Sequence, residues 1–228
     1  TIFQWRKEIT DYANLKEVNR RLAEENADWR NRHSSSYTPV EDLYVRINDT
    51  IHRQEYSVIT AKVVNSTWHK QKNFLTLDKG ATGGVHADMG VVGSDGIVGV
   101  VREVSPHFAS VISVLNEDHM ASAQLQGTKH FGLLRWNTGD PRTVSLADID
   151  KHVPVHKGDT VVTRGSEGVY PPGILIGVVD SVANDPGIPF HVITVRLSED
   201  LTRSDHVQVV SDLMRAERDS LEKTAPQE

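Results

Sequence analysis

The side chains that could perform chemistry are a few serines and histidines in glycine-rich stretches. Ser94 lies in the sequence Gly-Ser-Asp-Gly at 93–96, which is similar to the nucleophile loop of a serine protease. A catalytic serine also needs a histidine base and a carboxylate to orient it, and His86 and Asp88 are the candidates upstream. Ser166 stands in another loop without the elbow pattern of a hydrolase. Because Asp-Gly is an ordinary hairpin turn, we interpret 93–96 as a turn and predict no catalysis.

The histidines do not form a metal-binding pattern. His152 and His156 are four residues apart, but Pro154 between them opposes the helix that would place both rings on one face. The sequence has no cysteine, which excludes disulfides and thiolate zinc sites. The glycine-rich segment 80–84 lacks the Lys-Ser/Thr ending of a phosphate-binding loop. We therefore predict no metal site and no cofactor.

Charge and hydropathy narrow the classes of partner. The net charge is −6, and a quarter of the residues are charged. This balance argues against nucleic acid, because a phosphate-binding surface needs clustered Lys and Arg. No apolar run approaches the ~18 residues of a membrane span. The chain begins at Thr1, so we expect a removed upstream segment, either a signal sequence or a membrane anchor.

Short runs rich in β-branched residues begin at residue 57 and recur with turn residues between them. Their spacing of 8 to 12 residues is typical of a barrel or sandwich, and helical periodicity is not sustained. Strands are predicted at 57–64, 73–77, 91–92, 97–104, 110–115, 120–125, 130–136, 143–146, 160–163, 174–182, 192–197 and 207–210.

Two stretches resemble each other at an offset of about 78 residues. The run 96–104 matches 173–182, and 111–115 matches 192–197. We interpret them as parts of two β-modules built on one plan. Gly99 and Gly177 occupy equivalent positions in the two stretches, and glycine inside a strand marks a bulge or a close backbone approach. Valine at either position should lower the free energy of unfolding by about 1–3 kcal/mol, because the added side chain overpacks the site. The residues assigned to structural turns or close approaches are Gly93, Gly96, Gly99, Gly165, Pro172, Gly173 and Gly177.

The first 33 residues predict a coiled-coil helix that associates with a second copy. They contain neither Gly nor Pro, and their apolar residues repeat every seven. Asparagine at core positions favours a two-stranded register. Docking of this helix on its own β-module is the alternative. The seam residues assigned to self-association are Trp5, Tyr12, Leu15, Asn19, Leu22, Asn26 and Trp29.

The remaining boundaries follow from composition. Residues 34–56 are a linker and connector, and 40–56 fits either a strand or a helix. We divide the β-region into module 1 at 57–150 and module 2 at 151–211, and leave open whether strands interleave between them. A short C-terminal helix and tail occupy 212–228, and Ser211 or Asp212 could cap that helix.

The region from Ala61 to Val182 resembles the rod shape-determining MreC family. One signature begins with Asn-Phe-Leu-Thr-Leu-Asp-Lys-Gly at 73–80 and continues through the glycine–valine segment up to residue 100. The other is Gly-Asp-Thr-Val-Val-Thr at 158–163, followed by Tyr-Pro-Pro-Gly-Ile at 170–174. Arg164 and Tyr170 depart from the family pattern, which often has Ser and Phe there.

This resemblance implies a mainly β fold, in which a helix precedes two small β-barrels in a chymotrypsin-like arrangement. It also implies a non-catalytic scaffold of the cell-elongation complex, anchored by one helix to the periplasmic face of the bacterial inner membrane. The implied partners are penicillin-binding protein 2, RodA, MreD and MreB. We assign partner binding to Arg164, Ser166 and Tyr170, and to a loop at 185–189. The alternative function is a periplasmic adaptor of a transport or efflux system, which also joins a coiled coil to β-domains.

Overall fold

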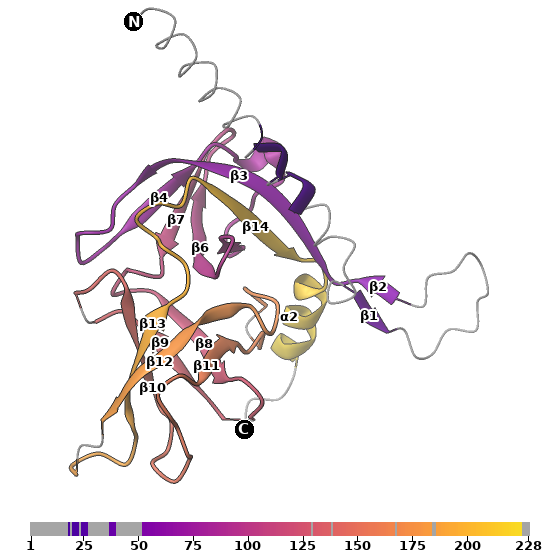
Figure 1. The fold of residues 1–228 in the computed structure, drawn as a ribbon. Coiled ribbons are helices and arrows are strands. Elements are labelled where there is room, and N and C mark those ends of the chain that lie inside the picture. Colours follow the sequence, from indigo (N-terminus) through magenta and orange to yellow (C-terminus); the bar gives the residue numbers. More distant parts are fainter. Residues whose placement is uncertain are drawn as a thin grey trace, which may run out of the picture.

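A computed structural model describes residues 18, 20–22, 24–26, 37–39, 52–128, 130–137, 139–166, 168–183 and 186–224. Two closed barrels of six strands dominate it, stacked one above the other in Figure 1. The predicted mainly β fold with two barrels is therefore confirmed. The strands are β1 Tyr37–Pro39, β2 His52–Gln54, β3 Tyr56–Ser66, β4 Phe74–Leu77, β5 Gly90–Val92, β6 Ile97–Val104, β7 Ala109–Ser113, β8 Met120–Leu125, β9 Phe131–Arg135, β10 Thr143–Ala147, β11 Thr160–Thr163, β12 Leu175–Ala183, β13 Val192–Leu197 and β14 His206–Asp212.

Each barrel encloses its own apolar core. Along β8 and β10, buried residues alternate with partly exposed ones, because successive side chains of a strand point to opposite faces. The interior of barrel 1 holds Leu77 and Ile97, and that of barrel 2 holds Leu146 and Ile176, all at most 1% exposed. The polar residues between them face outward, which explains why the sequence shows alternation rather than continuous apolar runs.

The two barrels share one topology. Barrel 1 runs in the order β14-β3-β4-β7-β6-β5 and barrel 2 in the order β10-β13-β12-β11-β8-β9, with all pairs antiparallel. Strands β3 to β7 of barrel 1 correspond in order to β9 to β13 of barrel 2. Strand β14, between β3 and β5, then corresponds to β8, between β9 and β11.

This correspondence describes a reciprocal strand exchange. In chain order, the repeats are β3–β8 and β9–β14, and the sixth strand of each closes the barrel of the other. The predicted boundary at residue 150 is therefore wrong, because β8, β9 and β10 lie in barrel 2 and β14 lies in barrel 1. Local patterns predict strands but not their distant partners, so the boundary could not be read from spacing.

Irregularities in the strand pairing repeat as well. The register shifts between Val101 and Glu103 where β6 meets β7, and between Val179 and Ser181 where β12 meets β13. The offset between these bulges is the one that relates Gly99 to Gly177. Bulges bend a strand and increase its twist, so β6 and β12 bend at equivalent positions in the two barrels.

The C-terminal helix α2, Arg215–Thr224, lies beside the junction of the two barrels (Figure 1). Just before it, the Asp212 carboxylate accepts a hydrogen bond from the Met214 N–H at 2.8 Å. The cap position itself is Met214, whose carbonyl oxygen accepts the first helical hydrogen bond from the Arg218 N–H, so the cap predicted at Ser211 or Asp212 lies two or three residues too early.

At the other end of the chain, β1 pairs with β2 in a separate two-stranded ribbon, so parts of the predicted connector are strand. Residues 18, 20–22 and 24–26 are helical, and ion pairs four residues apart join Arg20 to Glu24 and Arg21 to Glu25. Of the predicted seam, Leu22 and Asn26 are exposed on this helix, while Trp5, Tyr12, Leu15, Asn19 and Trp29 lie outside the described residues. Pairing of the helix stays a prediction.

Candidate functional site

Strands β5 and β6 of barrel 1 contact the loop between β11 and β12 of barrel 2. Tyr170, which is 5% exposed, donates a hydrogen bond from its hydroxyl to the Gly99 carbonyl oxygen at 2.7 Å. A methyl group on Gly90 would overlap the Val169 carbonyl oxygen and lie 2.9 Å from the Tyr170 ring. Glycine at 90 thus lets the tyrosine of barrel 2 approach the backbone of barrel 1.

A buried carboxylate fastens the hairpin turn at the same joint. Glu199, in the connection from β13 to β14, accepts hydrogen bonds from the Asp95 N–H and the Ser204 hydroxyl, each at 2.8 Å. Gly93 lies so close that any side chain there would overlap the carboxylate. Hydrogen bonds to a charged acceptor are strong. The bond between Asp95 and Glu199 therefore joins the turn at 93–96 of barrel 1 to the chain segment that leaves barrel 2, and the role of this turn is structural.

The structure does not assemble the residues considered for a catalytic triad. The Ser94 hydroxyl bonds to the neighbouring Asp95 carboxylate at 3.1 Å, at the joint between the barrels. His86 and Asp88 instead line a cavity of about 240 Å³ beside α2. There Arg215 donates to the Asp88 carbonyl oxygen at 2.8 Å. Arg215, Ala216 and Asp219 of α2 form part of the wall of this cavity.

Helix α2 contacts β14 of barrel 1 through an ion pair and the loop after β11 through packing against Gly168. Arg218 bonds to Asp212 at 2.6 Å, and the carboxylate is 1% exposed. A methyl group on Gly168, which has φ +64°, would overlap the Arg218 guanidinium. Burial, and then the charge of Glu55, raise the pKa of the neighbouring Tyr56 hydroxyl far above its usual value. Helix α2 therefore links the end of β14 to the loop that follows β11.

The remaining turn residues shape that loop. Gly165 has φ +80° and lies against Pro172, and Gly173 has φ +83°. Residues with side chains rarely adopt these values. The Thr163 hydroxyl donates to the Pro171 carbonyl oxygen at 2.6 Å. The loop is thus ordered by its own contacts and presents Tyr170 to barrel 1.

Of the three residues predicted to bind a partner, two lie on the surface and one does not. The Arg164 guanidinium stacks 3.4 Å from the centre of the Phe131 ring, a cation–π contact on the outer face of barrel 2. Ser166 is exposed. Tyr170 is buried against barrel 1, so its predicted outward-facing role is corrected to a structural one. The sequence places Tyr170 in a loop directly before two prolines, and this local pattern does not show that the ring packs against the other barrel.

A cleft of about 430 Å³ opens on the outer surface of barrel 2 beside Phe131. Its apolar lining comes from Phe131 and Leu133 of β9 and from Ile149 in the loop that follows β10, and Asp148 and Asp150 are exposed at its rim. Sequence reasoning missed this cleft. The alternation of β9 predicts an outward Phe131, but not the loop that folds over it.

The described residues hold no group of three or more His, Asp or Glu side chains that could bind a metal ion. One histidine is nevertheless unusual. His119, between β7 and β8, is 4% exposed, and its Nε2 atom has no hydrogen-bond partner. Burial lowers the pKa of its ring from 6.5 to about 4. It therefore lies neutral at the crossover from barrel 1 to barrel 2.

Replacing Tyr170 by Phe tests the joint with a minimal change. The ring and its packing remain, but a buried hydroxyl that bonds to the Gly99 carbonyl is lost. We expect a loss of about 1 kcal/mol in the free energy of unfolding, because a buried carbonyl loses a partner. Urea unfolding measures it, with Tyr44→Phe as a control for removing any tyrosine hydroxyl. Equal stability of Tyr170→Phe and the parent would show that the hydrogen bond does not fasten the joint.

Comparison with known proteins places the chain among bacterial shape-determining proteins. The model of the family "Rod shape-determining protein MreC, barrel core" matches residues 63–211. The cell shape-determining protein MreC of Listeria monocytogenes is 27% identical over 176 residues, which is 75% of this chain and 59% of that protein. The chain thus spans less than two thirds of that relative.

Solved structures show the same fold. MreC from Listeria monocytogenes superposes with a TM-score of 0.64 at 25% identity, covering 92% of this chain and 94% of that one. The major periplasmic domain of the cell shape-determining filament MreC gives a TM-score of 0.62 at 21% identity, over 70% of this chain and 98% of that one. A chain in the complex between penicillin-binding protein 2 and MreC from Helicobacter pylori gives 0.54 at 15% identity, over 70% and 99%.

The family match extends from β3 into β14 and so includes the strands of both barrels and the glycine–tyrosine joint between them. The chain belongs to the MreC family of rod shape-determining proteins.

Proposed function

We propose that this chain is a non-catalytic scaffold that maintains rod shape by organising peptidoglycan synthases. The supporting observation is an exposed apolar surface at one end of barrel 2, on a body whose barrels are firmly joined. Such surfaces mark protein–protein contacts. Penicillin-binding protein 2 is the first partner to test, because the related protein of Helicobacter pylori forms a complex with it.

The proposed synthase surface combines Phe131, stacked under Arg164, with the loop that precedes β13. In this loop Ile188 is 40% exposed and Phe190 36% exposed. The loop is tied to the wall of the cleft, because Lys151 N–H donates to the Pro189 carbonyl oxygen at 3.2 Å. Aromatic and Arg side chains dominate the energetics of protein interfaces, so these residues form one candidate interface.

Negative charge introduced into this surface should weaken the binding of the synthase. Phe131→Glu with Ile188→Glu places two carboxylates where apolar contact is proposed, and we expect at least a tenfold loss of affinity for penicillin-binding protein 2. The matched control is Phe108→Glu, because Phe108 is 51% exposed on barrel 1. Biolayer interferometry measures binding, and cell shape reports function. If the double variant binds as tightly as the parent while Phe108→Glu does not, the surface is misplaced.

The other expected associations belong to the same proposal. A membrane segment upstream of Thr1 would hold the barrels on the periplasmic face of the inner membrane, where RodA and MreD would be reached directly and MreB across the membrane. Within the described residues, no helix is both long and apolar enough to cross a membrane. Fractionation of full-length protein in cells, with co-purification of each partner, tests this placement.

Self-association through the N-terminal helix is the second part of the proposal. Leu22 is 47% exposed in the single chain, and an exposed seam leucine favours pairing with a second helix. Leu15→Asp with Leu22→Asp should convert dimers to monomers and leave the barrels folded. Sedimentation equilibrium measures this, with circular dichroism as the folding check. A parent that stays monomeric at high concentration, with its helix protected from hydrogen exchange, would favour docking on its own barrel.

A further inference from the structure

An exposed tryptophan projects from barrel 1, on the turn between β3 and β4. Trp68 is 42% exposed, and its ring meets His69 edge-on at 5.5 Å between ring centres. His69 and Lys70 beside it are exposed. We call Trp68, His69 and Lys70 the knob. It combines a large apolar side chain with neighbouring cationic character, a composition suited to an apolar pocket with an acidic rim.

The turn that carries the knob is ordered before any partner binds. The Asn73 side chain accepts a hydrogen bond from the Lys70 N–H at 3.0 Å and donates to the Lys70 carbonyl oxygen at 2.6 Å. On the other side of the turn, Lys72 forms a 2.7 Å ion pair with Asp118. Because the loop is already ordered, little conformational entropy would be lost when Trp68 enters a binding site.

The cleft on barrel 2 has the complementary properties. Its volume of about 430 Å³ is in the range of sites that bind small ligands or single large side chains. Leu133 and Phe131 supply apolar contact, and Asp148 and Asp150 supply negative charge. Asp148 has φ +65°, a conformation that costs energy for most residues with side chains and is often retained at functional sites.

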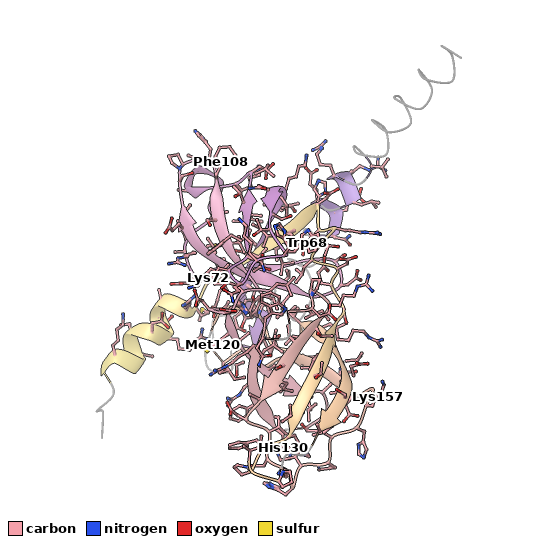
Figure 2. All side chains as sticks on the ribbon, turned by 90° about the vertical axis from the view of Figure 1, so that its left-hand side faces the viewer. Trp68, Lys72, Phe108, Met120, His130 and Lys157 are labelled. Atoms are coloured by element: carbon pink, nitrogen blue, oxygen red, sulfur yellow. The ribbon has the colours of Figure 1, made fainter. Side chains whose placement is uncertain are left out.

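We infer that the knob of one copy inserts into the cleft of a second copy of this chain. The second copy fits the cleft because the positive charge of Lys70 complements the carboxylates of Asp148 and Asp150. In Figure 2, Trp68 lies on barrel 1, whereas His130, beside the cleft, lies at the far end of barrel 2. Each copy in such a contact keeps one free knob and one free cleft, so the contact is head-to-tail and generates open chains of molecules.

The contact is weak by itself, because one side chain in one cleft buries less surface than the ~1,200 Å² of a stable interface. Attachment of many copies to one membrane would raise their effective concentration and make the contact effective. The inference depends on the proposed function only because it assigns a surface to the proposed self-association. It does not require the synthase contact.

Chemical crosslinking tests the contact directly, because the chain has no cysteine. Gln71→Cys places a thiol beside the knob and His130→Cys places one beside the cleft, and both leave the proposed contacts intact. The background carries Leu15→Asp and Leu22→Asp to remove helix pairing. With a short bismaleimide, we expect the mixture of the two variants to form dimers at least five times more than either variant alone. A chain carrying both cysteines should form a ladder.

Four further substitutions make the result specific. Lys157→Cys, 74% exposed elsewhere on barrel 2 (Figure 2), replaces His130→Cys as a control and should give the low yield of the single variants. Trp68→Ala should reduce the dimer yield at least fivefold. Lys70→Glu or Asp150→Lys alone should reduce it similarly, and the two changes together should restore it.

Several outcomes would overturn the inference. Equal yields with Lys157→Cys, or homodimers of Gln71→Cys as abundant as the mixed dimer, would show that the contact is not knob to cleft. Crosslinking of His130→Cys to penicillin-binding protein 2 in membranes, with none to a second copy, would assign the cleft to the synthase instead. The cleft shares Phe131 with the proposed synthase surface, so Ile188→Glu alone, which leaves the lining of the cleft unchanged, tests the synthase surface separately.

Discussion

Gly99→Ala and Gly177→Ala are each expected to lower the free energy of unfolding by about 3 kcal/mol or more, at the upper end of overpacking effects. A methyl group on Gly99 would overlap the Ile112 carbonyl oxygen, and one on Gly177 would overlap the Arg196 carbonyl oxygen. In both barrels the obstacle is the backbone of the neighbouring strand, which cannot move aside without breaking its own hydrogen bonds. The valine substitutions considered from sequence should be at least as damaging.

The two glycines should therefore behave as a matched pair. Gly83→Ala is the control, since the nearest atoms to its added methyl belong to the flexible Lys79 side chain, the closest at 3.3 Å. Thermal and urea unfolding of the three alanine variants measures the effect. If Gly99→Ala and Gly177→Ala unfold at the same urea concentration as Gly83→Ala, the close approach of the strands does not limit these positions.

His119 should make the protein sensitive to mild acid. Its pKa is about 4 in the folded protein, against an ordinary value of 6.5. Because the folded-state pKa is the lower one, the neutral ring's contribution is present above pH 6.5 and is lost as pH falls towards 4. The difference corresponds to ~3 kcal/mol of stability, at ~1.4 kcal/mol per pH unit.

Replacing His119 by Leu should remove this loss, since an apolar side chain of similar size has no proton to bind. No hydrogen bond of Nε2 is sacrificed, because that atom has no partner. Urea unfolding at pH 7.0, 5.5 and 4.5 compares the parent, His119→Leu, and His130→Leu as a control at an exposed histidine. A parent and a His119→Leu variant that lose stability equally between pH 7.0 and 4.5 would exclude His119 as the acid-sensitive group.

Sequence reasoning succeeded where structure is local. The predicted strand from 97 to 104 coincides with β6, and that from 160 to 163 with β11, because alternation and turn residues act over a few neighbours. The offset between Gly99 and Gly177 survives as equivalent bulges and equivalent close approaches. At both positions the neighbouring backbone lies too close for any side chain, so only glycine fits. The requirement is therefore recognisable in the sequence.

What could not be predicted depends on contacts between distant segments. Tyr170 reads as a loop residue, yet its partner is a carbonyl 71 positions earlier in the chain. Glu199 carries no local signal for the turn that it fastens at Asp95. The cleft needs β9 and the loop at 148–153 together. Each of these features follows from how the barrels close and meet.

The exchanged strands set the order in which the molecule is completed during synthesis. All strands of barrel 2 have been made once the chain reaches Leu197, whereas barrel 1 lacks its sixth strand until residues 206–212 follow. Until then β3 and β5 present open edges, which are prone to pair with other chains. The barrel that begins first is thus finished last, because β3 and β5 keep a free edge until β14 has been made.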